Sequence, residues 1–177
     1  ICLAAVKKDG YALEYVKKQT EKICKIAVRR GSLVMLLVKN QTPAICLEAV
    51  KSYGEALEYV ENQTEEMCIE AVKSVGYALQ FVKKQTHKIC LAAVKTDGIV
   101  LEYVENQTDV ICLTAVKDRG ISLIYVKRQT PEICLAAVKQ DGLALKYVEK
   151  QTYKICLAAI KQKSFALKYV KNQTPII

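Results

Sequence analysis

The chain has 177 residues, of which 51% are apolar and 25% are charged, and its formal net charge is +9. Seven glycines and three prolines are too few for a collagen-like or a Pro/Gly-rich disordered protein. The longest apolar runs, such as residues 33–38, fall far short of the roughly 20 residues that span a bilayer. We therefore expect a folded chain with no membrane span.

The sequence repeats itself every 22 residues along its whole length. The period is marked by threonines at Thr20, Thr42, Thr64, Thr86, Thr108, Thr130, Thr152 and Thr174. A fixed period of this length is the signature of a repeat protein. We predict one array of eight repeats over residues 1–177. Because the pattern is cut within a repeat at both ends, we expect this array to be a piece of a longer one.

Each repeat begins with a predicted helix, which is clearest in the seventh repeat, residues 130–151. Thr130 is a good N-cap, and Pro131 suits the first helical position, as do Pro43 and Pro175 in the equivalent places. An apolar stripe at helical spacing follows, formed by Ile133, Cys134, Ala137 and Val138. This pattern predicts a helix with one buried face.

A turn and a second helix complete the predicted repeat. Gly142 follows Asp141, and we expect this glycine to end the first helix in the left-handed conformation, with Ser32 and Ser164 as its substitutes in two repeats. The second helix is expected to bury Ala144, Leu145 and Val148, to place Tyr147 at its flank, and to end near Gln151. Two helices of roughly 8–10 residues are unstable alone and must stack on their neighbours. The predicted fold is an all-α solenoid.

Three columns of equivalent residues carry further structural predictions; each column is named here after its member in the seventh repeat. The Ala137 column is alanine in every repeat, which indicates a close approach of helices where nothing larger fits. The Gln151 column is always glutamine and is expected to form a ladder of hydrogen bonds to helix-end carbonyls. The Tyr147 column is aromatic in seven repeats and leucine at Leu37, which is typical of packing at the edge of a core.

The eight cysteines form another column, one per repeat. Neighbouring helices lie about 8–10 Å apart, whereas a disulfide needs Cα atoms within about 7 Å. We therefore expect buried, reduced thiols, which place the chain in the cytoplasm or another reducing compartment.

The repeat pattern CLxAVKxxGxALxYVxxQT resembles the DUF4116 repeat family over the whole chain. The fifth repeat carries it in full, with Cys90, Ala93, Val94, Lys95, Gly98, Leu101, Tyr103, Val104, Gln107 and Thr108 all in place. Similar repeats are found in giant viruses and in bacteria that live inside amoebae, so the resemblance implies a viral or host-cell setting, with the host cytoplasm or a virion as the compartment. The family name records an unknown function, so the resemblance implies a fold and no chemistry.

Catalytic and metal-binding chemistry has little support in the sequence. The single histidine, His87, lies in the first turn of a predicted helix, in a column that varies freely, and no nucleophile accompanies it. One cysteine per repeat does not provide the clustered ligands of a zinc site. We therefore expect no enzymatic activity, no catalytic residues, no metal and no cofactor.

A column of basic residues is the strongest binding candidate. We call it the Lys/Arg ridge, and it comprises Lys7, Arg29, Lys51, Lys73, Lys95, Lys117, Lys139 and Lys161. A stripe of positive charge attracts nucleic acid, acidic protein segments or anionic lipid. The alternative is purely structural, because a cation in the last turn of a helix is favoured by the helix dipole, and acidic Glu61, Glu105 and Glu149 interrupt a neighbouring column.

A second candidate lies where repeats depart from the pattern. Ile26, Leu36 and Ile124 are apolar in columns that are mostly small, polar or charged, and exposed apolar residues can mark a partner site. The expected function is a structural or protein-interaction scaffold that binds protein partners and can also associate end to end. The alternative is binding of nucleic acid or an acidic partner through the Lys/Arg ridge.

Overall fold

The computed structural model describes residues 1–172. It divides into two compact units, residues 1–96 and 97–177, which we call the N-terminal and C-terminal units. Thr174 and Pro175, two residues of the predicted pattern, lie outside the described residues.

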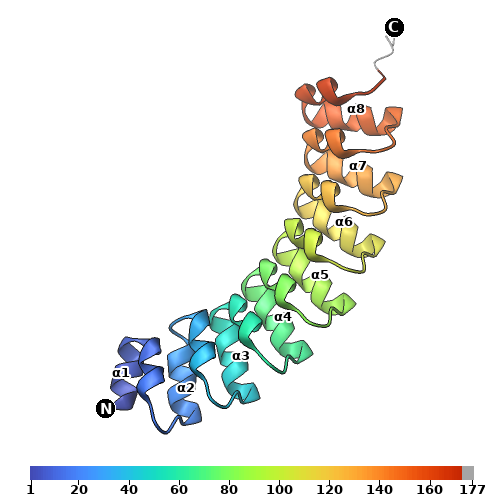
Figure 1. Ribbon diagram of the computed structural model, residues 1–177. Helices are drawn as coiled ribbons and strands as arrows, with labels where there is room; N and C mark the ends of the chain where they lie inside the picture. Colours follow the sequence, from blue (N-terminus) through green and yellow to red (C-terminus); the bar gives the residue numbers. More distant parts are fainter. Residues whose placement is uncertain (173–177) are drawn as a thin grey trace. The chain divides into compact units, whose positions relative to one another are not determined.

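Every repeat consists of an α helix followed by a 3-10 helix (Figure 1). The elements of the N-terminal unit are α1 (Cys2–Lys8), η1 (Gly10–Tyr15), α2 (Glu21–Val28), η2 (Ser32–Leu37), α3 (Pro43–Ser52), η3 (Gly54–Tyr59), α4 (Glu65–Ser74), η4 (Gly76–Phe81) and α5 (His87–Thr96). Those of the C-terminal unit are η5 (Gly98–Tyr103), α6 (Asp109–Asp118), η6 (Gly120–Tyr125), α7 (Pro131–Gln140), η7 (Gly142–Tyr147), α8 (Tyr153–Gln162) and η8 (Ser164–Tyr169). The all-helical repeat prediction is confirmed.

Within each unit the repeats stack in two layers. Consecutive α helices contact one another and form one layer, and consecutive 3-10 helices form the second layer. The core lies between the layers, where Ile133, Cys134, Ala137 and Val138 of α7 are at most 3% exposed. Ala144, Leu145 and Val148 are at most 1% exposed, so both predicted apolar stripes are confirmed.

The predicted start of the α helix is also confirmed. The Oγ1 of Thr130 accepts a hydrogen bond from the Ile133 N–H at 3.3 Å, and Thr64 caps α4 in the same way. Pro43 and Pro131 begin α3 and α7. The threonine column is therefore explained by N-capping.

The second element differs from the prediction. It is a six-residue 3-10 helix and not an α helix of 8–10 residues, and η7 ends at Tyr147, four residues before Gln151. Val148 follows in an extended conformation and is buried. The apolar spacing of Ala144, Leu145 and Val148 suits both kinds of helix, so the sequence pattern did not distinguish them.

The glycine prediction was wrong in its mechanism. No described residue has a left-handed backbone, and each conserved glycine begins the 3-10 helix after the α helix has ended. A Cβ atom built on Gly54 would lie 2.4 Å from the carbonyl oxygen of Ala71 in the next repeat, and one on Gly120 would lie 2.5 Å from that of Ala137. The glycine is needed because the next α helix approaches this closely, at the alanine column that predicted a close approach.

The glutamine column joins each repeat to the next. The Nε2 of Gln63 donates to the Phe81 carbonyl oxygen at 2.8 Å, and its Oε1 accepts from the Lys83 N–H at 2.9 Å. Gln19, Gln41, Gln107, Gln129 and Gln151 repeat this pair of bonds. The predicted ladder is confirmed, and we call each pair of bonds a glutamine clamp. It satisfies backbone groups at the end of a 3-10 helix, where the helix itself supplies no partner.

Candidate binding surfaces

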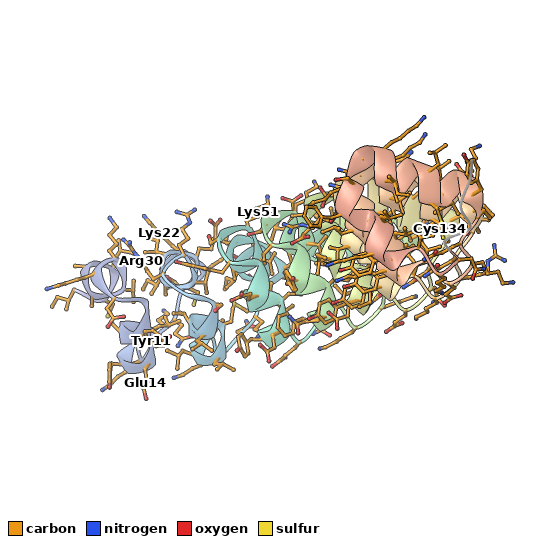
Figure 2. The ribbon with its side chains drawn as sticks, turned by 90° about the horizontal axis from the view of Figure 1, so that it is seen from above. Tyr11, Glu14, Lys22, Arg30, Lys51 and Cys134 are labelled. Carbon is orange, nitrogen blue, oxygen red and sulfur yellow. The ribbon has the colours of Figure 1, made fainter. Side chains whose placement is uncertain are left out.

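The two layers give each unit two outward faces of different character. Figure 2 shows Lys22 and Lys51 on one side of the N-terminal unit, and Tyr11 and Glu14 on the opposite side. We call these sides the α face and the 3-10 face, after the helices that form them. The candidate sites from the sequence fall on one face or the other.

The Lys/Arg ridge lies on the α face, and all eight of its side chains are exposed. Lys51, Lys73, Lys95, Lys117, Lys139 and Lys161 each stand in the last turn of their α helix, where the helix dipole favours a positive charge. Two members are neutralised by a nearby carboxylate. Arg29 pairs with Glu48, which holds the pKa of the Glu48 carboxyl below its usual value, and Lys73 pairs with Glu70 at 3.0 Å.

In the column that Glu61, Glu105 and Glu149 interrupt, the intervening lysines join successive repeats. The Nζ of Lys83 donates to the carbonyl oxygens of Val60 and Glu61 at 3.2 and 2.8 Å, and Lys127 and Lys171 bind the preceding repeat in the same way. Lysine and glutamate alternate from Lys39 to Lys171, and each of these three lysines binds backbone carbonyls of a repeat that carries a glutamate. This column belongs to the packing of the repeats and not to the ridge.

The three predicted apolar candidates are not brought together. Leu36 is 64% exposed on η2, and Ile124 is 50% exposed on η6, in the other unit. Ile26 is half-buried on α2, where it shares a shallow hollow with Lys22, Lys25 and other polar neighbours. Leu36 and Ile26 therefore belong to different faces of the N-terminal unit.

The cysteine column is buried, as predicted, from Cys24 to Cys134, whereas Cys2 is exposed and Cys156 is half-buried. All eight cysteines are reduced, with no disulfide among them. Burial raises the pKa of Cys46 and Cys68, and each thiol lies within 3.8 Å of the Oε1 of the preceding clamp glutamine. These thiols therefore act as small core residues that support the glutamine clamp.

In the described part of the chain, the candidate catalytic and metal-binding residues are not gathered into a site. His87 is exposed at the start of α5. Residues 1–172 hold no group of three or more His, Cys, Asp and Glu side chains that suits a metal ion. Within the same residues, no helix combines the length and apolar character needed to cross a bilayer.

The 3-10 face carries exposed residues that the sequence reasoning missed. Tyr15 is 81% exposed, Tyr11 is 49% exposed and Leu33 is 44% exposed, beside the exposed carboxylates of Glu14 and Glu58. The signal was present as spacing: the second and fifth residues of each 3-10 helix eclipse one another, because this helix has three residues per turn. Reading the segment as an α helix concealed that alignment.

Two segments of the chain, residues 64–107 and 130–173, match the family model described as "Domain of unknown function (DUF4116)". Each segment spans two of the 22-residue repeats. No curated protein and no solved structure matches the chain. The chain belongs to the DUF4116 family and is a helical repeat protein.

Proposed function

We propose that this chain is a non-enzymatic protein-interaction scaffold. The observation that carries the proposal is the contrast between an interior that hardly changes and outward positions that differ from repeat to repeat. Equivalent positions on the 3-10 face hold Glu14, Leu36, Glu58 and Gln80 in successive repeats, all of them exposed. In repeat proteins such an array of outward side chains forms an extended binding surface, and exposed apolar residues such as Leu36 are typical of protein contacts.

A photo-crosslinking amino acid placed at Leu36 tests the scaffold proposal. The variant is produced in the cell that naturally makes the protein, beside a matched variant with the same group at Ser74, which is exposed at the end of α4. We expect a discrete protein adduct from position 36 that excess unlabelled chain suppresses, and no such adduct from position 74. Equal, non-suppressible adducts from both positions would contradict the proposal.

End-to-end association is the second part of the proposal. In the last described repeat, Leu157 and Ile160 line a cleft of about 580 Å³, and Leu157 is 36% exposed. The residue equivalent to Ile160 in the seventh repeat, Val138, is fully buried. A second copy stacking on this face would cover it. Sedimentation velocity over a range of concentrations is expected to show self-association that Leu157→Glu removes, whereas a monomer at every concentration would contradict it.

The alternative function is binding of nucleic acid or an acidic partner through the Lys/Arg ridge. It is favoured by six exposed ridge lysines for which residues 1–172 provide no ion pair: Lys7, Lys51, Lys95, Lys117, Lys139 and Lys161. Replacing Lys51, Lys73, Lys95 and Lys117 with Gln removes four charges. If the ridge binds nucleic acid, oligonucleotide affinity and its salt dependence fall together. Unchanged affinity and salt dependence would rule this alternative out.

The buried column of reduced thiols supports a reducing compartment for the proposed scaffold. Cysteines in this column are separated by whole repeats and are packed into the core, so they gain nothing from oxidation. The cytoplasm is the compartment that we propose.

A further inference from the structure

The 3-10 face of the N-terminal unit combines exposed rings with carboxylates. The second and fifth residues of each helix share one side of this face, as Tyr11 and Glu14 do on η1, and as Glu55 and Glu58 do on η3. The sixth position adds Tyr15 on η1 and its equivalents on the other helices. Helices η1 to η4 contain three glutamates and no lysine or arginine, although the whole chain has a net charge of +9. The four helices are therefore acidic within a basic protein, and exposed lysines such as Lys17 and Lys18 follow only after the end of η1.

The rings and carboxylates of this face interact with each other. The hydrogen bond to Glu58 raises the pKa of Tyr59, and the negative charge of Glu55 on the same helix acts in the same direction. A cation that approaches η3 therefore meets a phenol ring and two carboxylates.

The C-terminal unit shows how the same rings receive a cation. In η7 and η8 the fifth residue is lysine, and the Nζ atoms of Lys146 and Lys168 lie 4.5 and 4.8 Å from the ring centroids of Tyr147 and Tyr169. The ring at the sixth position therefore presents its face to a cation from its own helix. In η1 and η3 the fifth residue is Glu14 or Glu58, so a carboxylate stands where those lysines stand. Neither η1 nor η3 contains a lysine or arginine that could supply a cation to Tyr15 or Tyr59. A cation from another molecule can take that place, and the adjacent carboxylate would stabilise it.

We propose that the 3-10 face of the N-terminal unit binds an arginine-rich segment of a partner protein. Guanidinium groups stack on aromatic rings and pair with carboxylates at the same time. The α helices of the same unit mix Lys22 and Lys51 with glutamates such as Glu66, whereas η1 to η4 carry glutamates and no basic residue, so charge complementarity favours the 3-10 face. This inference rests on the proposed scaffold function and names the class of partner and the face that it contacts.

Fluorescence anisotropy with a labelled peptide of alternating arginine and glycine tests the proposal on the full chain. The decisive variant is Glu14→Lys with Glu58→Lys. Its matched control is Glu61→Lys with Glu66→Lys, which makes the same charge change at exposed positions outside the 3-10 helices. We expect the first variant to weaken peptide binding by about tenfold or more and the control by less than about threefold. Circular dichroism confirms that both variants remain folded.

A second variant separates stacking from simple charge attraction. Replacing Tyr15 and Tyr59 with leucine keeps the carboxylates and removes the aromatic faces, and we expect a several-fold loss of affinity. Equal weakening by the two charge variants would overturn the proposal, because the attraction would then be general. Absence of peptide binding by the unaltered chain would also overturn it. That result would leave the crosslinking test at Leu36 to decide the scaffold function independently.

Discussion

At the scale of single residues, the close contact between a 3-10 helix and the next α helix makes glycine necessary at the first position of the 3-10 helix and dispensable at the position before it. Gly54 has no space for a Cβ atom, because the Ala71 carbonyl oxygen lies 2.4 Å from its ideal position. Gly31 makes no such close contact, because the nearest atom to its ideal Cβ position is 3.9 Å away. Two substitutions of the same kind should therefore differ in their effect on stability.

We expect Gly54→Ala to lower the free energy of unfolding by roughly 2 kcal/mol, because overpacking against backbone forces the repeats apart. Gly31→Ala should be neutral or slightly stabilising, since it restricts only the unfolded chain. Urea unfolding followed by circular dichroism measures both. A similar loss in the two variants would show that backbone conformation, and not the contact, accounts for the glycine.

A buried hydroxyl offers a stabilising change. Ser122 is fully buried on η6, and among the described residues its Oγ has no hydrogen-bond partner. The equivalent residue in the seventh repeat is Ala144, which fits the same space. We expect Ser122→Ala to stabilise the C-terminal unit by about 1 kcal/mol, because an unsatisfied buried hydroxyl carries a desolvation cost. Thermal unfolding checks this, and a lower melting temperature would indicate a partner for the hydroxyl.

At the scale of elements, the glutamine clamp supplies hydrogen-bond partners for backbone groups that the 3-10 helix itself leaves unpaired. A six-residue 3-10 helix leaves its terminal carbonyls and the following N–H groups without intrahelical partners, and the clamp of the preceding repeat supplies them. The clamp explains why the column is glutamine in every repeat, because the amide places a donor nitrogen and an acceptor oxygen side by side at the end of the side chain. The sequence predicted the ladder but not its register, which depends on where the 3-10 helix ends.

We expect Gln63→Ala to reduce stability by roughly 2 kcal/mol or more, since it leaves the Phe81 carbonyl and the Lys83 N–H unpaired in a half-buried place. Gln80→Ala is the matched control, because Gln80 is exposed and bonds only to Tyr77 on its own helix. Hydrogen exchange should show faster exchange at Lys83 in the first variant alone. If the Lys83 amide exchanged as slowly in Gln63→Ala as in the unaltered chain, the clamp would not be the source of its protection from exchange.

The cysteine column makes a second prediction at this scale. Burial raises the pKa of Cys68 and Cys112, so their thiols stay protonated where unfolded thiols begin to ionise. The stabilisation is therefore complete below the unfolded thiol pKa, which is about 8.5, and it is lost as the pH rises through the folded values. We expect a thiol reagent at pH 8 to modify exposed Cys2 first and the buried column only on unfolding. Equal rates for all cysteines would contradict this.

At the scale of the whole molecule, the sequence predicted what depends on a single repeat and missed what depends on two. The Thr130 cap and the α-helical stripe follow from local spacing and were confirmed. The role of Gly54 and the short 3-10 helix depend on the close approach of the next repeat, which no single repeat reveals. The exposed ring of Tyr11 was missed because its alignment with Glu14 follows from the 3-10 geometry.

The central claim of this account is that the repeated interior holds the fold and the outward 3-10 face is free to bind a partner. Urea unfolding of the Tyr15→Ser, Leu36→Ser double variant tests it most directly, because these side chains are 81% and 64% exposed. We expect the free energy of unfolding of this variant to differ from that of the unaltered chain by no more than about 0.5 kcal/mol, as for exposed substitutions in general. A loss of several kcal/mol would contradict it, since both side chains would then belong to the packing of the repeats.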